Sequence, residues 1–148
     1  MTTFLTFQLQ NEVFATNIKN VLEVILDSKI SEVPNTPAHI EGVINYRGEI
    51  IPIMNFRKKL CFPDNTETDN QIIIFDISKN NTIVKFGAIV DEVQNVIETD
   101  KINEKPEFGS KYNSEYIDGI IKQKDKYIML LNIKKLFADT DTQIISEI

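Results

Sequence analysis

Few side chains of this sequence could perform catalysis. His39 is the only histidine, and the surrounding VPNTPAHIEG does not indicate an activated base, so a serine- or cysteine-based catalytic site is not predicted. The adjacent acids Asp91 and Glu92 are explained more simply by a solvated strand end than by paired acid-base catalysis. The single cysteine, Cys61, excludes an intrachain disulfide and a cysteine-cluster metal site, and we interpret it as a small packing residue.

Motifs for other kinds of chemistry are also missing from the sequence. It has no glycine-rich phosphate loop and no GxSxG nucleophile elbow, and its carboxylates lack the spacing of a metal site. We therefore expect no catalytic residue, no metal and no cofactor. The prediction is a binding protein rather than an enzyme.

One cation, Arg47, stands out within the stretch GVINYRGEIIPIMN. Arg47 and Gly48 separate two apolar runs, which predicts a hairpin whose tip exploits the ability of Gly48 to take a positive φ. Arg47 is then either a solvated turn residue or an interface residue, whose planar fork pairs with a carboxylate while its stem packs on apolar surface. We favour the interface, because strands anchored by Val43, Ile50 and Ile51 would hold the tip rigid.

The charge balance limits the kinds of partner. Among 148 residues, 16 are Lys or Arg and 22 are Asp or Glu, which gives a net charge of −6 and a pI near 4.8. Nucleic-acid binding normally requires a basic surface, so it is not expected, and the short basic run FRKKL at 56–60 is interpreted as a solvated helix face. No apolar run reaches the roughly 18 residues of a membrane span, and the start lacks the features of a signal peptide. We expect a cytoplasmic protein without direct membrane insertion.

Strand patterns dominate the elements that must position these residues. The run FLTFQL alternates, and β-branched runs around turn-forming tips predict hairpins over 71–90 and 116–132. Helical patterns are short, lying near 17–21, 55–60, 132–137 and in the C-terminal tail. The polar stretch 61–70 is the best internal boundary.

The most informative feature is an internal repeat. Residues 39–55 align with 116–132 without a gap, at an offset of 77 (Gly42 to Gly119). Residues 18–25 align with 90–97 at an offset of 72 (Val24 to Val96). Both blocks occur in the same order, which chance similarity between apolar strands explains poorly.

Each half is too small for a comfortable independent core. Closing each half into a small barrel removes the sheet edges, and packing the barrels together buries the remaining apolar faces. We predict an all-β fold of two similar small barrels with a shared apolar interface and few short helices. The expected lobes are 13–66 and 70–137, with 1–10 exchanged between lobes and 138–148 as a C-terminal tail.

The run VPNTPAHIEGVINYRGEIIPIMNFRKKL resembles the most characteristic stretch of CheW-like chemotaxis coupling proteins, with its Pro-Asn and Asn-x-Arg-Gly motifs. The resemblance continues through NIKNVLEVI, GAIVDEVQNVI and YIDGIIK and covers about residues 3 to 137. It implies two intertwined five-stranded SH3-like barrels and a non-catalytic adaptor. Such adaptors link the cytoplasmic tips of chemoreceptors to the regulatory domain of the histidine kinase CheA, in arrays beneath the inner membrane.

The resemblance also implies two binding surfaces. The receptor-binding residues would be Val21, Glu23, Arg47 and Val96, and the kinase-binding residues would be Gly42, Asn45 and Gly48. Val21 and Val96 could equally be core residues. Tyr46 stands where the family often has leucine.

Three other functions remain open at this stage. The same fold could serve a different receptor-kinase pathway, such as one controlling surface motility. A small-ligand or enzymatic barrel would need a polar-lined pocket. A nucleic-acid barrel would show salt-sensitive binding to oligonucleotides.

Overall fold

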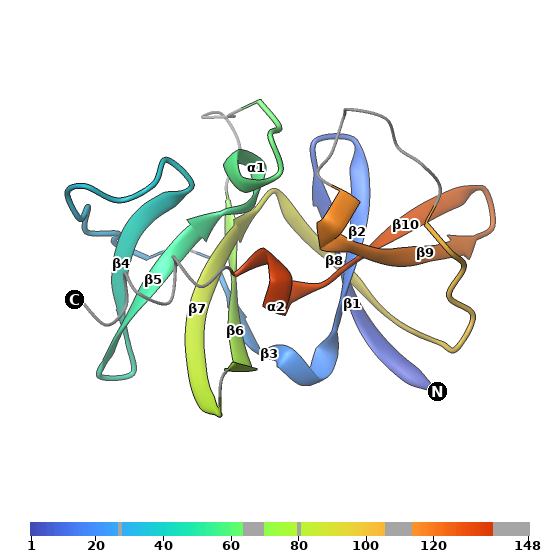
Figure 1. Ribbon diagram of the computed structural model, residues 1–148, viewed down its shortest axis with the longest axis horizontal. Helices are drawn as coiled ribbons and strands as arrows, with labels where there is room; N and C mark the ends of the chain where they lie inside the picture. Colours follow the sequence, from blue (N-terminus) through green and yellow to red (C-terminus); the bar gives the residue numbers. More distant parts are fainter. Residues whose placement is uncertain (27, 64–69, 80, 106–113, 138–148) are drawn as a thin grey trace.

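The computed structural model describes residues 1–26, 28–63, 70–79, 81–105 and 114–137. These residues form two five-stranded sheets side by side (Figure 1). We call them barrel 1 and barrel 2. Barrel 1 has the strand order β3-β6-β7-β5-β4, with bounds Val21–Ile25, Gln71–Lys79, Thr82–Val90, Glu49–Asn55 and Ile40–Tyr46. Barrel 2 has the order β8-β1-β2-β10-β9, with bounds Glu92–Thr99, Thr2–Leu9, Glu12–Asn17, Lys126–Leu131 and Ile117–Gln123.

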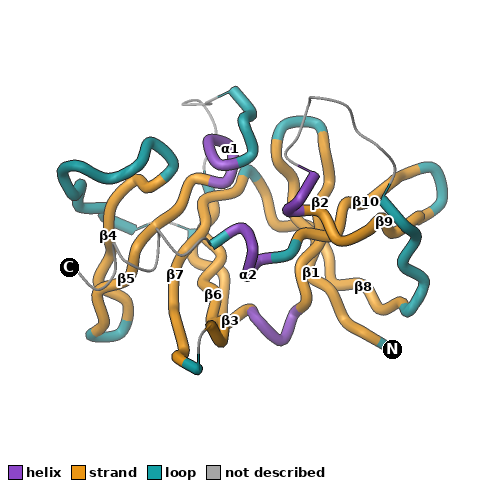
Figure 2. Tube along the Cα trace, in the orientation of Figure 1, coloured by secondary structure: helices purple, strands orange, loops and turns teal. Residues whose placement is uncertain are grey.

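The helices of the described residues are short (Figure 2). They are η1 (Ile18–Asn20), α1 (Phe56–Lys59), η2 (Ser114–Tyr116) and α2 (Ile133–Leu136). The all-β prediction of two five-stranded SH3-like barrels with few short helices is therefore confirmed. The predicted helix in the tail lies outside the described residues. None of the helices in the described part of the chain has the length and hydropathy needed to cross a bilayer.

The two barrels exchange strands. β1 and β2 open the chain but pair with β8 and β10 of the second half, while β6 and β7 return to pair with β3 and β5. The exchange uses equivalent pairings, because β2 lies parallel to β10 and β7 lies parallel to β5. Each half therefore contributes its first two strands to the other half's barrel, and the barrels are intertwined as expected.

Strand pairing does not divide the chain at the expected 13–66 and 70–137. Barrel 1 runs from β3 to β7, and barrel 2 combines β1 and β2 with β8, β9 and β10. The exchanged segment covers both N-terminal strands, 2–17, and not only 1–10. The expected boundary at residue 66 and the expected C-terminal tail, 138–148, lie outside the described residues.

Pairs of equivalent contacts show the internal repeat in three dimensions. Ser31 and Val43 exchange two backbone hydrogen bonds of 2.9 Å, and Asn103 and Ile120 exchange two of 2.8 and 2.9 Å. The two pairs are separated by the same offsets as the two sequence blocks, 72 (31 to 103) and 77 (43 to 120). In each half, a segment that follows the edge strand crosses over to cover the opposite edge.

The helix caps repeat as well. Asn55 and Asn132 each accept a hydrogen bond from the backbone N–H three residues later, at 3.2 and 3.0 Å. The side-chain amide of Asn55 donates to Glu41 at 3.0 Å, and that of Asn132 donates to Asp118 at 3.3 Å. An asparagine forms the N-cap of both α1 and α2, at the end of β5 and directly after β10, because it satisfies an otherwise unpaired donor of the short helix that follows.

The predicted shared apolar interface is the largest core of the protein. It joins residues of both barrels, including Phe7 and Phe14 of barrel 2 and Phe75 and Phe86 of barrel 1. Phe56 of α1 bridges the two groups, since its ring centroid lies 6.1 Å from the ring centroid of Phe7 and 6.1 Å from that of Phe75. Each barrel also has a smaller core: Ile44, Ile51, Ile53, Ile72 and Ile74 in barrel 1, and Phe4, Ala15, Ile121, Ile128 and Leu130 in barrel 2.

A buried ion pair fastens the two barrels at one end of this interface. Arg57 of α1 donates through Nε to Asp91 at 2.6 Å and through Nη2 to the second oxygen of the same carboxylate. Nη1 donates to the Gln10 side chain at 2.8 Å and to the Pro63 carbonyl at 2.7 Å. The Asp91 carboxylate also accepts from the Gln10 backbone at 2.8 Å. We call this group, which connects α1, the β1–β2 turn and the β7–β8 junction, the clamp.

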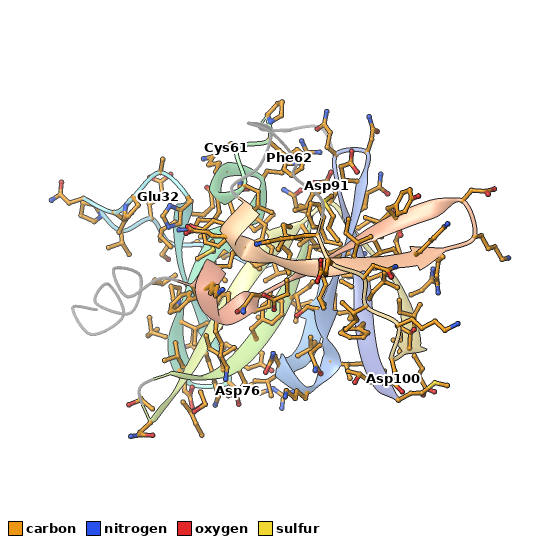
Figure 3. All side chains as sticks on the ribbon, turned by 45° about the vertical axis from the view of Figure 1, so that its right-hand side comes forward. Glu32, Cys61, Phe62, Asp76, Asp91 and Asp100 are labelled. Carbon is orange, nitrogen blue, oxygen red and sulfur yellow. The ribbon has the colours of Figure 1, made fainter. Side chains whose placement is uncertain are left out.

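Three expectations for this end of the molecule are wrong. The FRKKL run is not wholly a solvated face, because the Arg57 side chain is only 8% exposed. Asp91 is not a solvated strand end, since its side chain is 12% exposed and bonded to Arg57. Cys61 is exposed, with a positive φ of 65°, and does not pack in the core. Cys61, Phe62 and Asp91 gather at this end (Figure 3). Periodicity could not reveal the clamp, because its partners come from three distant segments.

Candidate partner-binding site

The tip between β4 and β5 is a tight two-residue turn. Arg47 and Gly48 both have positive φ values, 51° and 86°. The backbone N–H of Gly48 donates to the Asn45 side chain at 3.0 Å, which closes the turn. Both residues at positive φ are typical of the hairpin turn that best matches strand twist, in which Asn followed by Gly is the preferred sequence. An arginine is therefore not the residue that turn chemistry alone would select at position 47.

Arg47 does not simply point into solvent. Its Nη2 donates to Glu23 Oε1 of β3 at 3.0 Å, and the hydroxyl of Tyr46 donates to the same oxygen. The Arg47 guanidinium also lies over the Tyr46 ring, 5.4 Å from its centroid. We call Glu23, Tyr46 and Arg47 the triad. The Arg47 side chain remains 74% exposed and that of Glu23 34% exposed, so the triad is a surface feature.

The triad joins the two edges of barrel 1. β3 and β4 are the outermost strands of the sheet order, and no backbone ladder between them is present among the described residues. Glu23 lies on β3, whereas Tyr46 ends β4 and Arg47 follows it in the turn. A second ion pair lies nearby on the same hairpin, where Lys85 of β7 contacts Glu49 at 3.1 Å. Ion pairs to Glu23 of β3 and to Lys85 of β7 thus hold the two ends of the charged turn.

The pKa of Tyr46 is shifted, and the hydrogen bond from its hydroxyl to Glu23 is the main cause. Together with burial and the negative charge of Glu23, it raises the pKa of Tyr46 above its ordinary value, against the opposing effect of the Arg47 charge. The raised pKa means that the Tyr46 phenol keeps its proton, and keeps donating to Glu23, to a higher pH than an ordinary tyrosine would.

The two valines proposed for receptor binding lie in different barrels. Val21 begins β3, is half-buried and packs against the shared core. Val96 lies on β8, opposite Leu5 of β1, and is 55% exposed. A core role therefore describes Val21 in part and does not describe Val96. The structure brings Glu23 and Arg47 into contact and places Val96 in the other sheet.

The three residues proposed for kinase binding share the β4–β5 hairpin. Asn45 and Gly48 are exposed at its tip. Gly42 is buried at a bulge in β4, with a φ of 148°, and a Cβ at this position would overlap the carbonyl oxygen of Ser31. Glycine is required there because the 31–43 bridge brings the backbone too close for a side chain. Of the anchoring residues expected for the tip, Ile51 is buried but Ile50 is half exposed.

Sequence reasoning did not foresee the role of Tyr46. The sequence offered one signal, a tyrosine beside the Arg-Gly motif where the resemblance implied leucine, but the partner of its hydroxyl lies 23 residues away on another strand. No group of three or more His, Cys, Asp or Glu side chains within the described ranges could hold a metal ion. A half-exposed cluster of charge beside exposed apolar side chains is suited to binding another protein.

The fold and this cluster define a protein-docking module: two strand-exchanged barrels that present a charged hairpin tip. Comparison with known proteins identifies its kind. The model of the CheW-like domain matches residues 3–141. The chain belongs to this family, whose members are non-catalytic scaffolds and adaptors, and it is a chemotaxis adaptor.

Individual relatives agree over nearly the whole chain. It is 31% identical to the chemotaxis protein CheW of Treponema pallidum, over 93% of this chain and 83% of that protein. It is 30% identical to the chemotaxis protein CheW of Thermotoga maritima, over 91% and 87%. The crystal structure of the scaffolding protein TtCheW from Thermoanaerobacter tengcongensis superposes with a TM-score of 0.83 at 33% identity, covering 95% of this chain and 94% of that one.

Proposed function

We propose that this adaptor couples the cytoplasmic tips of methyl-accepting chemoreceptors to the histidine kinase CheA. It binds the receptor through the surface around Arg47 and Glu23, with Val21 and Val96 as apolar contacts. It binds the regulatory domain of the kinase through the hairpin that carries Gly42, Asn45 and Gly48. The adaptor works in the cytoplasm, beneath the membrane that holds the receptors, and turns over no substrate itself.

The observation that carries the proposal is the position of Arg47. A residue selected only to make the turn would be Asn, since a non-glycine residue with a long side chain at positive φ is strained. Lys124 occupies the same turn position in barrel 2, with a φ of 49°, so strain alone does not single out Arg47. What distinguishes Arg47 is that Glu23 and Tyr46 hold it in place while three-quarters of its side chain stays exposed. A pre-positioned arginine loses little entropy on binding and is a common hot spot.

The test uses a pair of matched variants, Arg47→Asn and Lys124→Asn. Each replaces a basic turn residue at positive φ with the residue that the turn prefers, so neither should reduce stability. Co-sedimentation and titration are carried out with a receptor cytoplasmic fragment, with the kinase, and with both together. Arg47→Asn should weaken receptor binding by about 2 kcal/mol, which is more than tenfold in affinity. Lys124→Asn should leave receptor binding unchanged.

The kinase arm of the experiment tests the adaptor mechanism itself. The wild-type protein should increase kinase autophosphorylation only when the receptor fragment is present, because the contribution of an adaptor is to position its partners. Full receptor binding by Arg47→Asn would remove Arg47 from the receptor surface. Stimulation of the kinase without receptor would contradict the coupling role.

A further inference from the structure

Tyr46 ends β4 directly before Arg47, and its hydroxyl donates to Glu23 of β3. We propose that Tyr46 is a positioning residue that fixes Arg47 and Glu23, so that the outer side of the Arg47 guanidinium receives a carboxylate of an acidic partner segment. The proposal rests on the proposed function, because the partner is the receptor.

The first step of the argument is geometric. One oxygen, Glu23 Oε1, accepts both from the Tyr46 hydroxyl and from Arg47 Nη2. The Arg47 guanidinium lies over the face of the Tyr46 ring, with its Cζ 5.4 Å from the ring centroid. Tyr46 thus contacts both charged members of the triad, one through its hydroxyl and the other through its face. A leucine at this position could do neither.

The second step concerns what remains available on Arg47. A guanidinium has five N–H donors in a fixed plane, and the bond to Glu23 uses one nitrogen, Nη2. The two bidentate edges of a guanidinium are Nε with Nη2 and Nη1 with Nη2, and Nη2 carries two hydrogens. With the side chain 74% exposed, the edge that Glu23 does not occupy can bind a second planar acceptor in the bidentate way that carboxylates favour. The negative charge of Glu23 beside it disfavours a phosphate dianion more than a singly charged carboxylate. The partner group that fits is therefore an Asp or Glu side chain.

The third step is the comparison with barrel 2. The positions equivalent to Glu23, Tyr46 and Arg47 are Asn95, Gln123 and Lys124, at the offsets of 72 and 77. Asn95 is bonded through its backbone to the Thr6 hydroxyl of the neighbouring strand, at 3.0 Å in both directions. The repeat therefore supplies a hairpin of the same geometry with neither the tyrosine nor the carboxylate. Barrel 1 alone carries the triad chemistry.

The test separates the hydroxyl from the ring. Tyr46→Phe retains the ring under Arg47 and removes the bond to Glu23, and Gln123→Phe is the matched control in barrel 2. Tyr46→Phe should weaken binding of the receptor fragment by about tenfold, the scale of a hydrogen bond to a charged group. Gln123→Phe should change it by less than about twofold. In an Arg47→Asn background, Tyr46→Phe should have no further effect, because a positioning residue acts through the residue it positions.

A partner-free measurement keeps the two proposals distinguishable. Spectrophotometric titration of the tyrosines in the isolated protein should show one phenol that ionises at unusually high pH, and this phenol should return toward ordinary behaviour in Glu23→Gln. If the phenol signal is present but Tyr46→Phe binds receptor like wild type, while Arg47→Asn does not, the positioning role is overturned and the proposed function stands. If Arg47→Asn also binds the receptor fragment normally, both the positioning role of Tyr46 and the proposed receptor surface are overturned. If Tyr46→Phe weakened receptor binding as much in the Arg47→Asn background as in the wild type, the positioning role of Tyr46 would also be overturned.

Discussion

Removing one member of the clamp should be among the most damaging single substitutions in this protein. In Asp91→Ala, the Arg57 guanidinium, whose side chain is 8% exposed in the wild-type protein, loses two charge-assisted hydrogen bonds. Removing one partner of a buried ion pair typically costs 3–5 kcal/mol, because the other charge is left buried and uncompensated. Arg57 keeps the Gln10 and Pro63 oxygens as acceptors, so we expect the low end, about 3 kcal/mol. For a chain of this size, that corresponds to a fall of roughly 10 °C in Tm.

The internal repeat provides the control for this experiment. Lys19 occupies the position equivalent to Asp91, at the offset of 72, and its side chain is exposed. Lys19→Ala should change the free energy of unfolding by no more than about 0.5 kcal/mol. Urea unfolding and thermal melting of both variants measure the difference.

A double variant distinguishes the loss of the pair from the loss of packing. Arg57→Met combined with Asp91→Leu replaces the ion pair by apolar side chains of similar size, and it should be more stable than either single variant. The reasoning would be refuted if Asp91→Ala lost less than about 1 kcal/mol or melted like Lys19→Ala. Such a result would mean that the desolvation of Arg57 is offset elsewhere.

Three further predictions concern single positions. Gly42→Ala should lower the free energy of unfolding by about 2 kcal/mol or more, because the added Cβ would overlap a backbone carbonyl. Gly48→Ala has open space around its Cβ and should cost only about 1 kcal/mol, which comes from its positive φ. Urea unfolding of both variants measures the difference. The buried hydroxyl of Thr16 has no hydrogen-bond partner among the described residues, so Thr16→Val should raise stability by about 1 kcal/mol, and a lower Tm would contradict this. The pKa of Tyr46 is raised on folding, so the stability that its bond to Glu23 contributes is present below about pH 10 and is lost as pH rises past the folded-state value. The difference in urea midpoint between wild type and Tyr46→Phe should therefore shrink between pH 8 and pH 11, and a constant difference would count against it.

Local pattern was enough to predict most of the strands, three of the four short helices in the described residues, and the internal repeat. Alternation and β-branched runs depend on one strand's own two faces, so they can be read without knowing the strand's neighbour. The paired offsets of the repeat carried the prediction of two similar barrels, and the motif around Asn45 to Gly48 carried the family. The exposed hairpin tip at Arg47 could be predicted because it is determined by residues adjacent in the chain, and its role in binding a partner stays a prediction.

What the tertiary structure decided is which distant segments meet. The periodicity of FLTFQL does not indicate that β1 and β2 complete the barrel of the second half. The backbone edges of all strands offer similar hydrogen-bonding groups, so the alternation of one strand does not specify its partner. The burial of Arg57 depends on Asp91, 34 residues after it, and on Gln10 of the β1–β2 turn, 47 residues before it. Tyr46 and Arg47 meet a carboxylate only because strand β3 places Glu23 at the open edge of barrel 1, 24 residues before Arg47. Charges are exposed or paired according to these long-range contacts, whereas strands form according to their neighbours in sequence.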